Sequence, residues 1–156
     1  MELDAALHQG LAQGDVDSCR RYYRARANGL FRYLLGMLPD GSAVEDVLQD
    51  AFLSLFSAVR EREVLHLDAY LYQTARRRAI NWLRDERREQ ERRHRQAADM
   101  RVEQVTTPLA ALLAGEETLR LYDALRQLPE EQREVVLLYC WSDMTFDAIG
   151  SLLEIP

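Results

Sequence analysis

The feature that most constrains the fold is the stretch 67–95, LDAYLYQTARRRAINWLRDERREQERRHR, where neither Gly nor Pro interrupts a helical pattern. Such a stretch, rich in Ala, Leu, Arg and Glu, predicts one long helix. We expect Asp68 to cap its N-terminus. Leu71, Ala75 and Trp82 recur at helical spacing, and they predict the face by which the helix packs.

The same stretch carries a concentrated positive charge. Residues 76–95 hold nine Arg against four acidic residues, a local charge of +5, whereas the whole chain carries −6. A basic patch on an acidic body can attract a polyanion, because screening confines the interaction to about 10 Å. A solvated helix laced with ion pairs is the commoner explanation for such a run. Cations, an amide and aromatic edges on one helix also suit a nucleic acid with unstacked bases.

The composition predicts an all-α protein with a real core. Of 156 residues, 47% are apolar, while only seven are Gly and four are Pro. Apolar spacing of three and four predicts helices before and after the basic stretch. We expect two small helical bundles joined by a polar linker, with the boundaries 1–95, 96–107 and 108–156.

Capping residues predict where several helices begin. Asp15 or Asp17 can cap the helix that follows Gly14, and Ser42 with Glu45 fits a capping box. Pro108 and Pro129 each stand near an expected helix start, and Thr145 can cap a last short helix. In the C-terminal helices the predicted apolar positions are Leu109, Leu112, Leu119, Tyr122, Leu125, Val135, Val136, Leu138, Tyr139, Phe146, Ile149, Leu152 and Leu153.

Several classes of function are excluded by what the chain lacks. No Gly-rich phosphate loop and no nucleophile with an adjacent base is present, and the three His stand at 8, 66 and 94, without metal-ligand spacing. We therefore expect no enzyme, no cofactor and no metal. The N-terminus MELDAALHQG is polar and no apolar run approaches 18 residues, which predicts a cytoplasmic protein without membrane insertion.

Three stretches, taken in order, resemble one family. They are VEDVLQDAFLSLF at 44–56, AYLYQTARRRAINWLR at 69–84 and LPEEQREVVLLYCWSDMTFDAIGSLLEIP at 128–156. They are similar to the patterns A-E-D-L-V-Q-E-V-F-L-R-L-W, W-L-x-x-I-A-R-N-x-A-I-D-x-L-R and L-P-x-x-Q-R-E-V-x-x-L. All three patterns occur in that order in the extracytoplasmic-function (ECF) group of bacterial RNA polymerase sigma factors, which the chain therefore resembles.

The resemblance implies two binding surfaces in the N-terminal half. The helix over 44–56 would dock on the beta′ clamp of core RNA polymerase, through Asp46, Gln49, Asp50 and Phe52. The basic helix would read and melt the promoter −10 element as single-stranded DNA. Phosphates and bases would be met by Arg76, Arg77, Asn81, Arg84, Arg87 and Arg88, with Leu65 and His66 in the preceding loop beside a flipped base.

This sequence departs from the family pattern at the basic helix. Arg77 stands where the family commonly has Asn, and Asn81 stands where it has Asp. The first exchange adds a positive charge and the second removes a carboxylate near the DNA. The base preference of relatives therefore does not transfer to this chain. Tyr72 and Trp82 are expected to pack in the core.

The resemblance also implies roles for the C-terminal part. Residues from Leu128 would contact the beta flap, and Thr145, Phe146, Ile149 and Leu152 match the first helix of a helix-turn-helix that reads the −35 element. The recognition helix would follow Pro156, so we expect the chain to be C-terminally incomplete. Sigma factors of this group serve in stress responses and are held by an anti-sigma factor, so the resemblance implies an anti-sigma factor as a partner.

The sequence thus predicts an ECF-type sigma factor that directs RNA polymerase to promoters. Two alternatives stay open. The chain could be a stand-alone helix-turn-helix regulator built on residues 128–156, or a helical adaptor that binds an acidic protein through its Arg-rich face.

Overall fold

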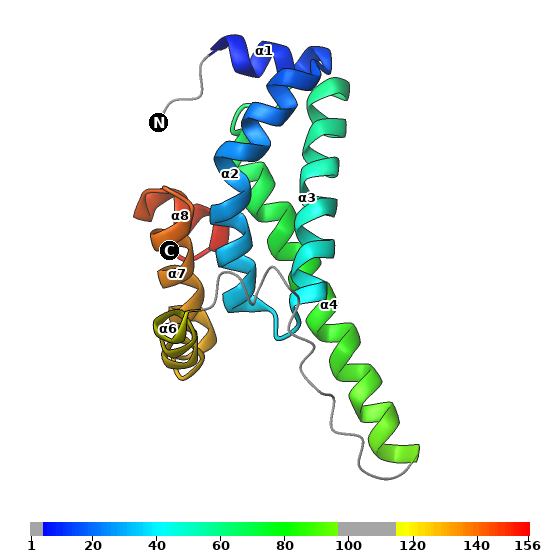
Figure 1. Ribbon diagram of the computed structural model, residues 1–156, viewed down its shortest axis with the longest axis vertical. Helices are drawn as coiled ribbons and strands as arrows, with labels where there is room; N and C mark the ends of the chain where they lie inside the picture. Colours follow the sequence, from blue (N-terminus) through cyan, green and yellow to red (C-terminus); the bar gives the residue numbers. More distant parts are fainter. Residues whose placement is uncertain (1–4, 97–114) are drawn as a thin grey trace.

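The computed structural model describes residues 5–96 and 115–156, which form seven helices and no strand. In chain order these are α1 (Ala5–Gln13), α2 (Val16–Met37), α3 (Gly41–Glu61), α4 (Leu67–Gln96), α6 (Glu116–Arg126), α7 (Glu130–Trp141) and α8 (Phe146–Leu153) (Figure 1). The predicted all-α fold is confirmed. The start of the helix expected from Pro108 and nearly all of the expected linker lie outside the described residues, while the later part of that helix is α6.

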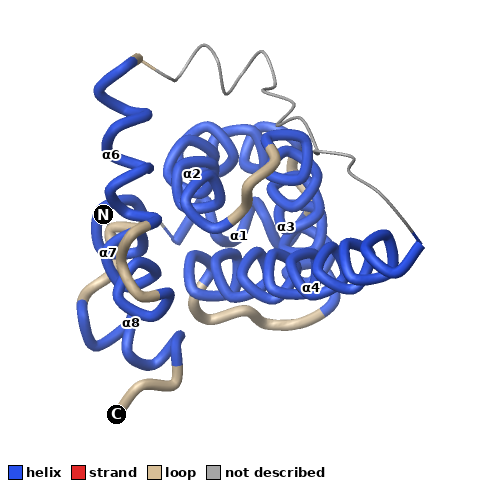
Figure 2. The backbone as a smooth tube through the Cα atoms, turned by 90° about the horizontal axis from the view of Figure 1, so that it is seen from below, coloured by secondary structure: helices blue, strands red, loops and turns tan. Residues whose placement is uncertain are grey.

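Helices α2, α3 and α4 form the main bundle, and α1 lies across one end of it (Figures 1 and 2). The core of the bundle contains an aromatic cluster. The Tyr22 ring packs in a T-shaped arrangement with the rings of Phe52 and Phe56, at centroid distances of 6.1 and 6.4 Å. Leu55 and Leu71 are fully buried beside it. Burying each such leucine stabilises the fold by about 1.5–3 kcal/mol.

Two of the bundle helices begin at aspartates. Asp15 caps α2, and its carboxylate accepts the backbone N–H of Ser18 at 2.9 Å. The cap of α3 is Asp40, which accepts the N–H of Ser42 at 2.9 Å. The prediction of Ser42 as the cap was wrong, because the helix begins at Gly41, two residues earlier than that cap implies, and Ser42 lies inside its first turn.

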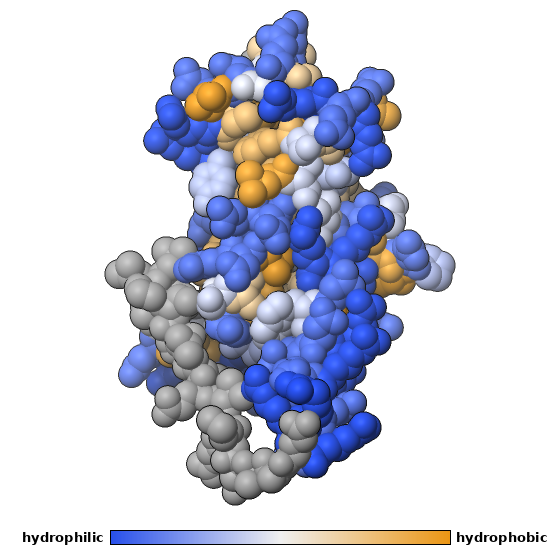
Figure 3. Space-filling view, turned by 90° about the vertical axis from the view of Figure 1, so that its right-hand side faces the viewer, coloured by the Kyte–Doolittle hydropathy of each residue, from blue (hydrophilic) through white to orange (hydrophobic). Residues whose placement is uncertain are grey.

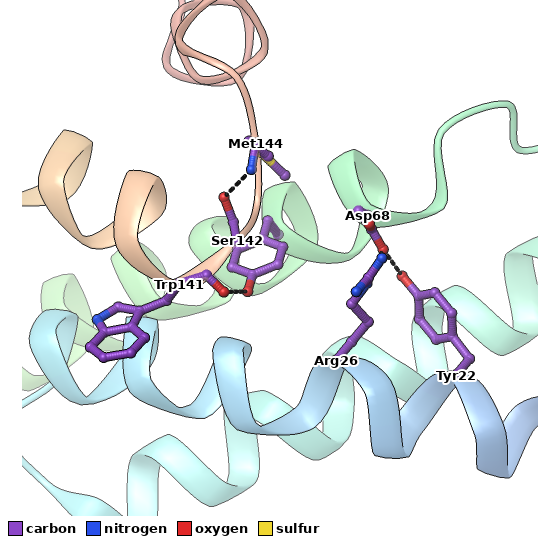
Figure 4. Close-up of polar contacts among 7 residues, drawn as sticks. Tyr22, Arg26, Asp68, Trp141, Ser142 and Met144 are labelled. Carbon is purple, nitrogen blue, oxygen red and sulfur yellow. Dashed lines mark hydrogen bonds and ion pairs between the residues drawn. The ribbon is translucent and has the colours of Figure 1, made fainter. Parts of the chain in front are cut away.

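The start of α4 is tied to α2 by a buried polar contact. Asp68 does not cap α4, as the sequence predicted, because the helix begins at Leu67 and Asp68 lies within its first turn. Its carboxylate instead accepts hydrogen bonds from the Tyr22 hydroxyl at 2.7 Å and from Nε of Arg26 at 2.8 Å (Figure 4). The contact holds the start of the long helix against α2.

Helices α6, α7 and α8 pack against the side of α2 and the first half of α4 (Figures 1 and 2). Two glycines of α2 permit the close approach. A Cβ on Gly29 would lie 2.3 Å from the carbonyl oxygen of Trp141, and one on Gly36 would lie 2.4 Å from Cδ2 of Leu137. The two bundles expected from the sequence are therefore in direct contact.

The side chains that α7 buries match the prediction only in part: Leu138 was predicted and is buried, whereas Leu137 was not predicted. Leu137 and Leu138 are fully buried, whereas Val136 is 37% and Tyr139 is 55% exposed. The face that meets α2 also contains Glu134, which the pattern of apolar residues alone does not place there. Leu119 of α6 is exposed as well, while its predicted neighbours in the apolar stripe, Tyr122 and Leu125, are buried.

The last helix begins as expected. Thr145 caps α8, and its side-chain oxygen accepts the N–H of Ala148 at 3.2 Å. Ile149 and Leu152 are buried in the hydrophobic core. None of the helices in the described ranges is both long and apolar enough to cross a membrane.

Candidate functional site

The long helix α4 has two different halves. Its first half is held in the bundle by Leu71, Ala75 and Ala79, all fully buried at helical spacing. Its second half projects beyond the bundle (Figures 1 and 2). In Figure 3 the lower part of the molecule, into which this end of α4 extends, is covered with hydrophilic side chains, whereas apolar side chains gather above. The projecting half is thus free to meet another molecule.

Most of the predicted DNA-binding side chains of α4 lie on its solvent-exposed surface. The exposed residues are Arg77, Asn81, Arg84, Arg87 and Arg88. Among the described residues Arg77, Arg87 and Arg88 form no ion pair, and Arg84 only approaches Asp85 at 3.9 Å. Their charges are therefore available to a polyanion.

Beyond Arg88 the helix neutralises much of its own charge. Glu89 lies 2.8 Å from Arg92 and 3.4 Å from Arg93. The hydrogen bonds from Arg92, aided by the charges of both arginines, hold the pKa of Glu89 below its usual range. The exposed cations without an ion pair thus concentrate between Arg77 and Arg88, in the middle of α4 rather than at its tip.

Arg76 differs from the exposed arginines of α4 because its guanidinium is bound by a buried acid. Nε donates to Oε1 of Glu134 at 2.6 Å and a terminal nitrogen donates to Oε2 at 3.4 Å, while the Tyr33 hydroxyl donates to Oε1 at 2.8 Å. Burial acts to lower the pKa of Arg76, but the hydrogen bond and charge of Glu134 outweigh it, so that pKa lies above its ordinary value. One buried acid from α7 thus joins α2 and α4.

The loop between α3 and α4 presents both residues predicted from it. Leu65 is 71% exposed and His66 is exposed as well, while Val64 between the helices is buried and anchors the loop. Beside the loop, the Arg62 guanidinium lies 5.5 Å from the centre of the Tyr70 ring. These two side chains, with serines of α3, line a shallow polar hollow. Neither Arg62 nor Tyr70 was predicted as a site residue.

The expected packing role of two aromatic side chains holds only in part. Tyr72 is 1% exposed, and its hydroxyl donates to the carbonyl of Trp141 at 3.0 Å. Trp82, further along α4, is half-buried against the edge of the core. Tyr72 thus belongs to the core and to the contact with α7.

The predicted polymerase-binding face of α3 borders an open groove between α2 and α3, of about 720 Å³. Phe52 is only 3% exposed and lies at the base of the groove, where the centroid of its ring is 4.7 Å from that of the Tyr23 ring. Leu53 is 59% exposed at its edge, and Glu45 and Gln49 add polar groups. The groove therefore combines exposed apolar surface with an acid and an amide.

The three polar residues predicted on α3 are all exposed, but only Gln49 lines the groove, on the side toward α2. Asp50 lies 3.4 Å from Arg78 of α4, which also donates to Ser54 at 2.9 Å. Asp46 neither lines the groove nor takes part in the contact with Arg78. Helical rotation of about 100° per residue places Gln49 and Asp50 on different sides of α3.

The residues predicted in the partial helix-turn-helix divide between core and surface. Thr145 caps α8, and Ile149 and Leu152 are buried. Phe146 is 63% exposed and stacks on Tyr139 of α7, with ring centroids 4.5 Å apart and planes within 5°. This stacked pair is a solvent-facing apolar patch that sequence periodicity did not predict. Among the described residues no cluster of His, Cys, Asp or Glu could hold a metal ion.

Two family models match this chain in the order of its two units. The model of Sigma-70 region 2 matches residues 22–89, and the model of Sigma-70 region 4 matches residues 118–156. Together the matches cover more than half of the chain, and the first contains all of α3 and most of α4. The chain belongs to the ECF group of RNA polymerase sigma factors. Sigma factors are transcription initiation factors that bind DNA.

Curated relatives agree with this assignment. The ECF RNA polymerase sigma factor SigM of Bacillus subtilis is 24% identical over 85% of this chain and 80% of its own length. The RNA polymerase sigma-E factor of Streptomyces antibioticus is 29% identical over 92% of this chain and 76% of its own length. The probable RNA polymerase sigma factor RfaY of Xanthomonas campestris is 30% identical over 97% of this chain, which spans 39% of that protein.

Proposed function

We propose that this ECF sigma factor directs RNA polymerase to promoters with a division of labour between two helices: α3 binds the core enzyme, and α4 binds and opens the −10 element. The observation that carries the proposal is the group of exposed arginines on α4 between Arg77 and Arg88, of which Arg77, Arg87 and Arg88 form no ion pair among the described residues. The bundle fixes the helix by its first half, so the cations are held in place before DNA arrives.

The DNA-binding role rests on charge and on access to bases. Arg77, Arg84, Arg87 and Arg88 would hold the phosphate backbone, because they are exposed and lie along one stretch of helix. Asn81 can exchange hydrogen bonds with a base edge from the same surface. Unstacked bases would be received near the exposed loop residues Leu65 and His66, next to the Arg62 and Tyr70 pair.

The polymerase-binding role rests on the groove between α2 and α3. Leu53 and the base formed by Phe52 offer apolar surface to a partner helix, and Gln49 can hydrogen-bond to it. Asp46 can attract an Arg-bearing partner from the exposed side of α3. We assign this face to the beta′ clamp. Asp50 is assigned to the edge of the same contact, where it would leave its ion pair with Arg78 and bind a basic group of the clamp instead.

The C-terminal unit would bind a second part of the enzyme. The stacked pair of Tyr139 and Phe146 exposes aromatic surface of the kind enriched at protein interfaces. We assign this pair to the beta flap. An anti-sigma factor would act by covering one of these faces, and it would then compete with core polymerase for binding.

Reconstitution with core RNA polymerase tests the proposal. The full chain should yield promoter-dependent transcripts from an ECF-type promoter and should make the −10 region reactive to permanganate. The double variant Arg84→Ala Arg88→Ala should lose opening while it still binds core polymerase. Gln49→Ala with Leu53→Ala should lose core binding while the free protein still binds single-stranded DNA. Equal loss of both activities in both variants would overturn the division of labour.

A further inference from the structure

The groove between α2 and α3 has the dimensions of a small-molecule site. Its volume of about 720 Å³ lies within the range of about 300–1,000 Å³ that is usual for sites that bind small organic molecules. The two helices lie side by side and are joined by a short turn after Met37 (Figure 1). Along α3 the lining extends from Glu45 to Phe56, a rise of about 16 Å. The groove therefore suits an elongated ligand.

The end of the groove near Phe56 is aromatic. The ring centroid of Phe52 lies 4.7 Å from that of Tyr23 and 5.9 Å from that of Phe56, and both pairs are tilted. Tyr23 is 43% exposed and Phe56 is half-buried, so a ligand can reach these rings from solvent. An aromatic group of the ligand can pack on them in an offset or edge arrangement.

The middle of the groove is apolar. Ala27 and Phe31 of α2 line it together with Leu48 of α3, and Leu53 is 59% exposed at its edge. A charged or strongly polar group would lose hydration here without gaining a partner. The part of a ligand that crosses this stretch is therefore expected to be a hydrocarbon chain.

The other end of the groove carries a carboxylate. Among the described residues that line the groove, Glu45 is the only charged one. It is exposed and forms no ion pair with another described residue. A carboxylate in this state can bind an ammonium group by charge-assisted hydrogen bonds. The net charge of −6 on the chain also favours a cation over an anion.

From this arrangement we propose that the groove binds an elongated amphipathic cation. Its aromatic group would lie among Tyr23, Phe52 and Phe56, and its positive charge would lie at Glu45. A bound molecule of this class would cover the face that α3 offers to core polymerase and would lower the affinity for that enzyme. This last step rests on the proposed polymerase-binding role of the groove, whereas the ligand site itself does not.

The probe is 6-phenylhexylammonium, which joins a phenyl ring to an ammonium group through a hydrocarbon chain. Titration of the ¹⁵N-labelled full chain, followed by NMR, should give a Kd of about 1 mM or tighter. The uncharged 6-phenylhexanol should bind about fivefold more weakly, because it makes no ion pair with Glu45. Benzylammonium is too short to reach both ends, and it should bind at least about tenfold more weakly.

Three variants locate the site. Glu45→Gln should lower the affinity for 6-phenylhexylammonium to that for 6-phenylhexanol. Leu53→Ala should weaken the binding of both molecules by about threefold or more, because it removes part of the apolar wall. Glu63→Gln is the matched control, since it removes the same charge from an exposed position that does not line the groove. Its affinity for both molecules should stay within about twofold of the parent.

Each result decides one part of the proposal. Equal affinities of the parent for the two long probes, or an unchanged affinity for the ammonium in Glu45→Gln, would overturn the role of Glu45. Unchanged binding of both probes in Leu53→Ala would place them outside the groove and overturn the site.

Competition with core polymerase tests the last step. At five times its Kd, 6-phenylhexylammonium should raise the apparent Kd for core polymerase about sixfold, and the same concentration should have less effect on Glu45→Gln. Binding of the probe without any competition would overturn the exclusion of polymerase, while the ligand site stands. Failure of the proposed function shows differently, as the absence of promoter-dependent transcripts when no probe is present.

Discussion

The carboxylate of Asp68 lies 2.8 Å from Nε of Arg26, so an acid in the first turn of α4 neutralises an arginine buried within α2. Arg26 is only 8% exposed, and the same carboxylate accepts the Tyr22 hydroxyl. Burial acts to lower the pKa of Arg26, but the hydrogen bond and charge of Asp68 outweigh it and keep that pKa above its usual value. The pair therefore fixes the position of α4 relative to α2.

Asp68→Asn should destabilise the fold by about 3 kcal/mol, because it leaves the Arg26 charge buried without a counter-charge. Urea unfolding followed by circular dichroism measures the loss. Asp17→Asn is the matched control, since the Asp17 pair with Arg20 is exposed and should change stability by about 0.5 kcal/mol or less. If both variants unfold at the same urea concentration, the buried pair does not have the role assigned to it.

Stability should fall steeply between about pH 10 and pH 12. Burial raises the pKa of Tyr122 to about 12, although the charges of Arg32 and Arg126 oppose it. An unfolded tyrosine releases its proton near pH 10. Between these values the folded state holds a proton that the unfolded state has lost, so rising pH favours unfolding. Burial also raises the pKa of Tyr22, Tyr33 and Tyr72, which adds to the same trend.

Tyr122→Phe should make the free energy of unfolding fall less steeply with pH in this range. The slope should decrease by up to about 1.4 kcal/mol per pH unit, the contribution of one proton. The measurement is the free energy of unfolding at a series of pH values from 8 to about 12. At neutral pH the variant should lose about 1 kcal/mol, because the hydroxyl no longer donates to the Arg32 carbonyl. An unchanged alkaline slope would show that Tyr122 ionises equally in both states.

The elements that sequence reasoning predicted well are those whose determinants are local. The extent of α4 follows from an uninterrupted helical pattern, and the observed helix exceeds the predicted stretch by one residue, Gln96. Thr145 caps α8 as predicted because a cap acts on an N–H only three residues away. The exposed arginines of α4 likewise follow from their position opposite the apolar stripe.

What sequence reasoning missed depends on which helices meet. Asp68 has the composition and place of a cap, yet its partners lie 42 and 46 residues away on α2. Glu134 reads as a solvated acid, and only the packing of α7 on α2 and α4 makes it a buried ligand of Arg76. Tyr139 is the opposite case: it was predicted to be buried but is 55% exposed. No local feature of α7 indicates that this side of the helix faces solvent.

The groove between α2 and α3 makes a prediction for polymerase binding. Leu53→Glu should weaken binding to core RNA polymerase by about tenfold or more, because it places a charge on an apolar contact surface. Leu53 is 59% exposed, so the fold itself should keep its stability. Val16→Glu is the matched control, since Val16 is 66% exposed at the start of α2 and does not line the groove. The affinity of each variant for core polymerase is measured by its ability to displace fluorescently labelled parent protein from the core enzyme.

The exposed arginines of α4 make a prediction about salt. Each phosphate contact to single-stranded DNA contributes about 0.7 to the slope of log affinity against log salt concentration, so Arg77→Ala with Arg88→Ala should flatten the slope by about 1.4. Arg20→Ala with Arg120→Ala removes the same charge from exposed ion pairs on α2 and α6 and should leave the slope unchanged. Anisotropy titrations with oligo(dT) at several salt concentrations measure both. Equal flattening in the two double variants would mean that only net charge matters and that α4 does not bind the phosphates directly.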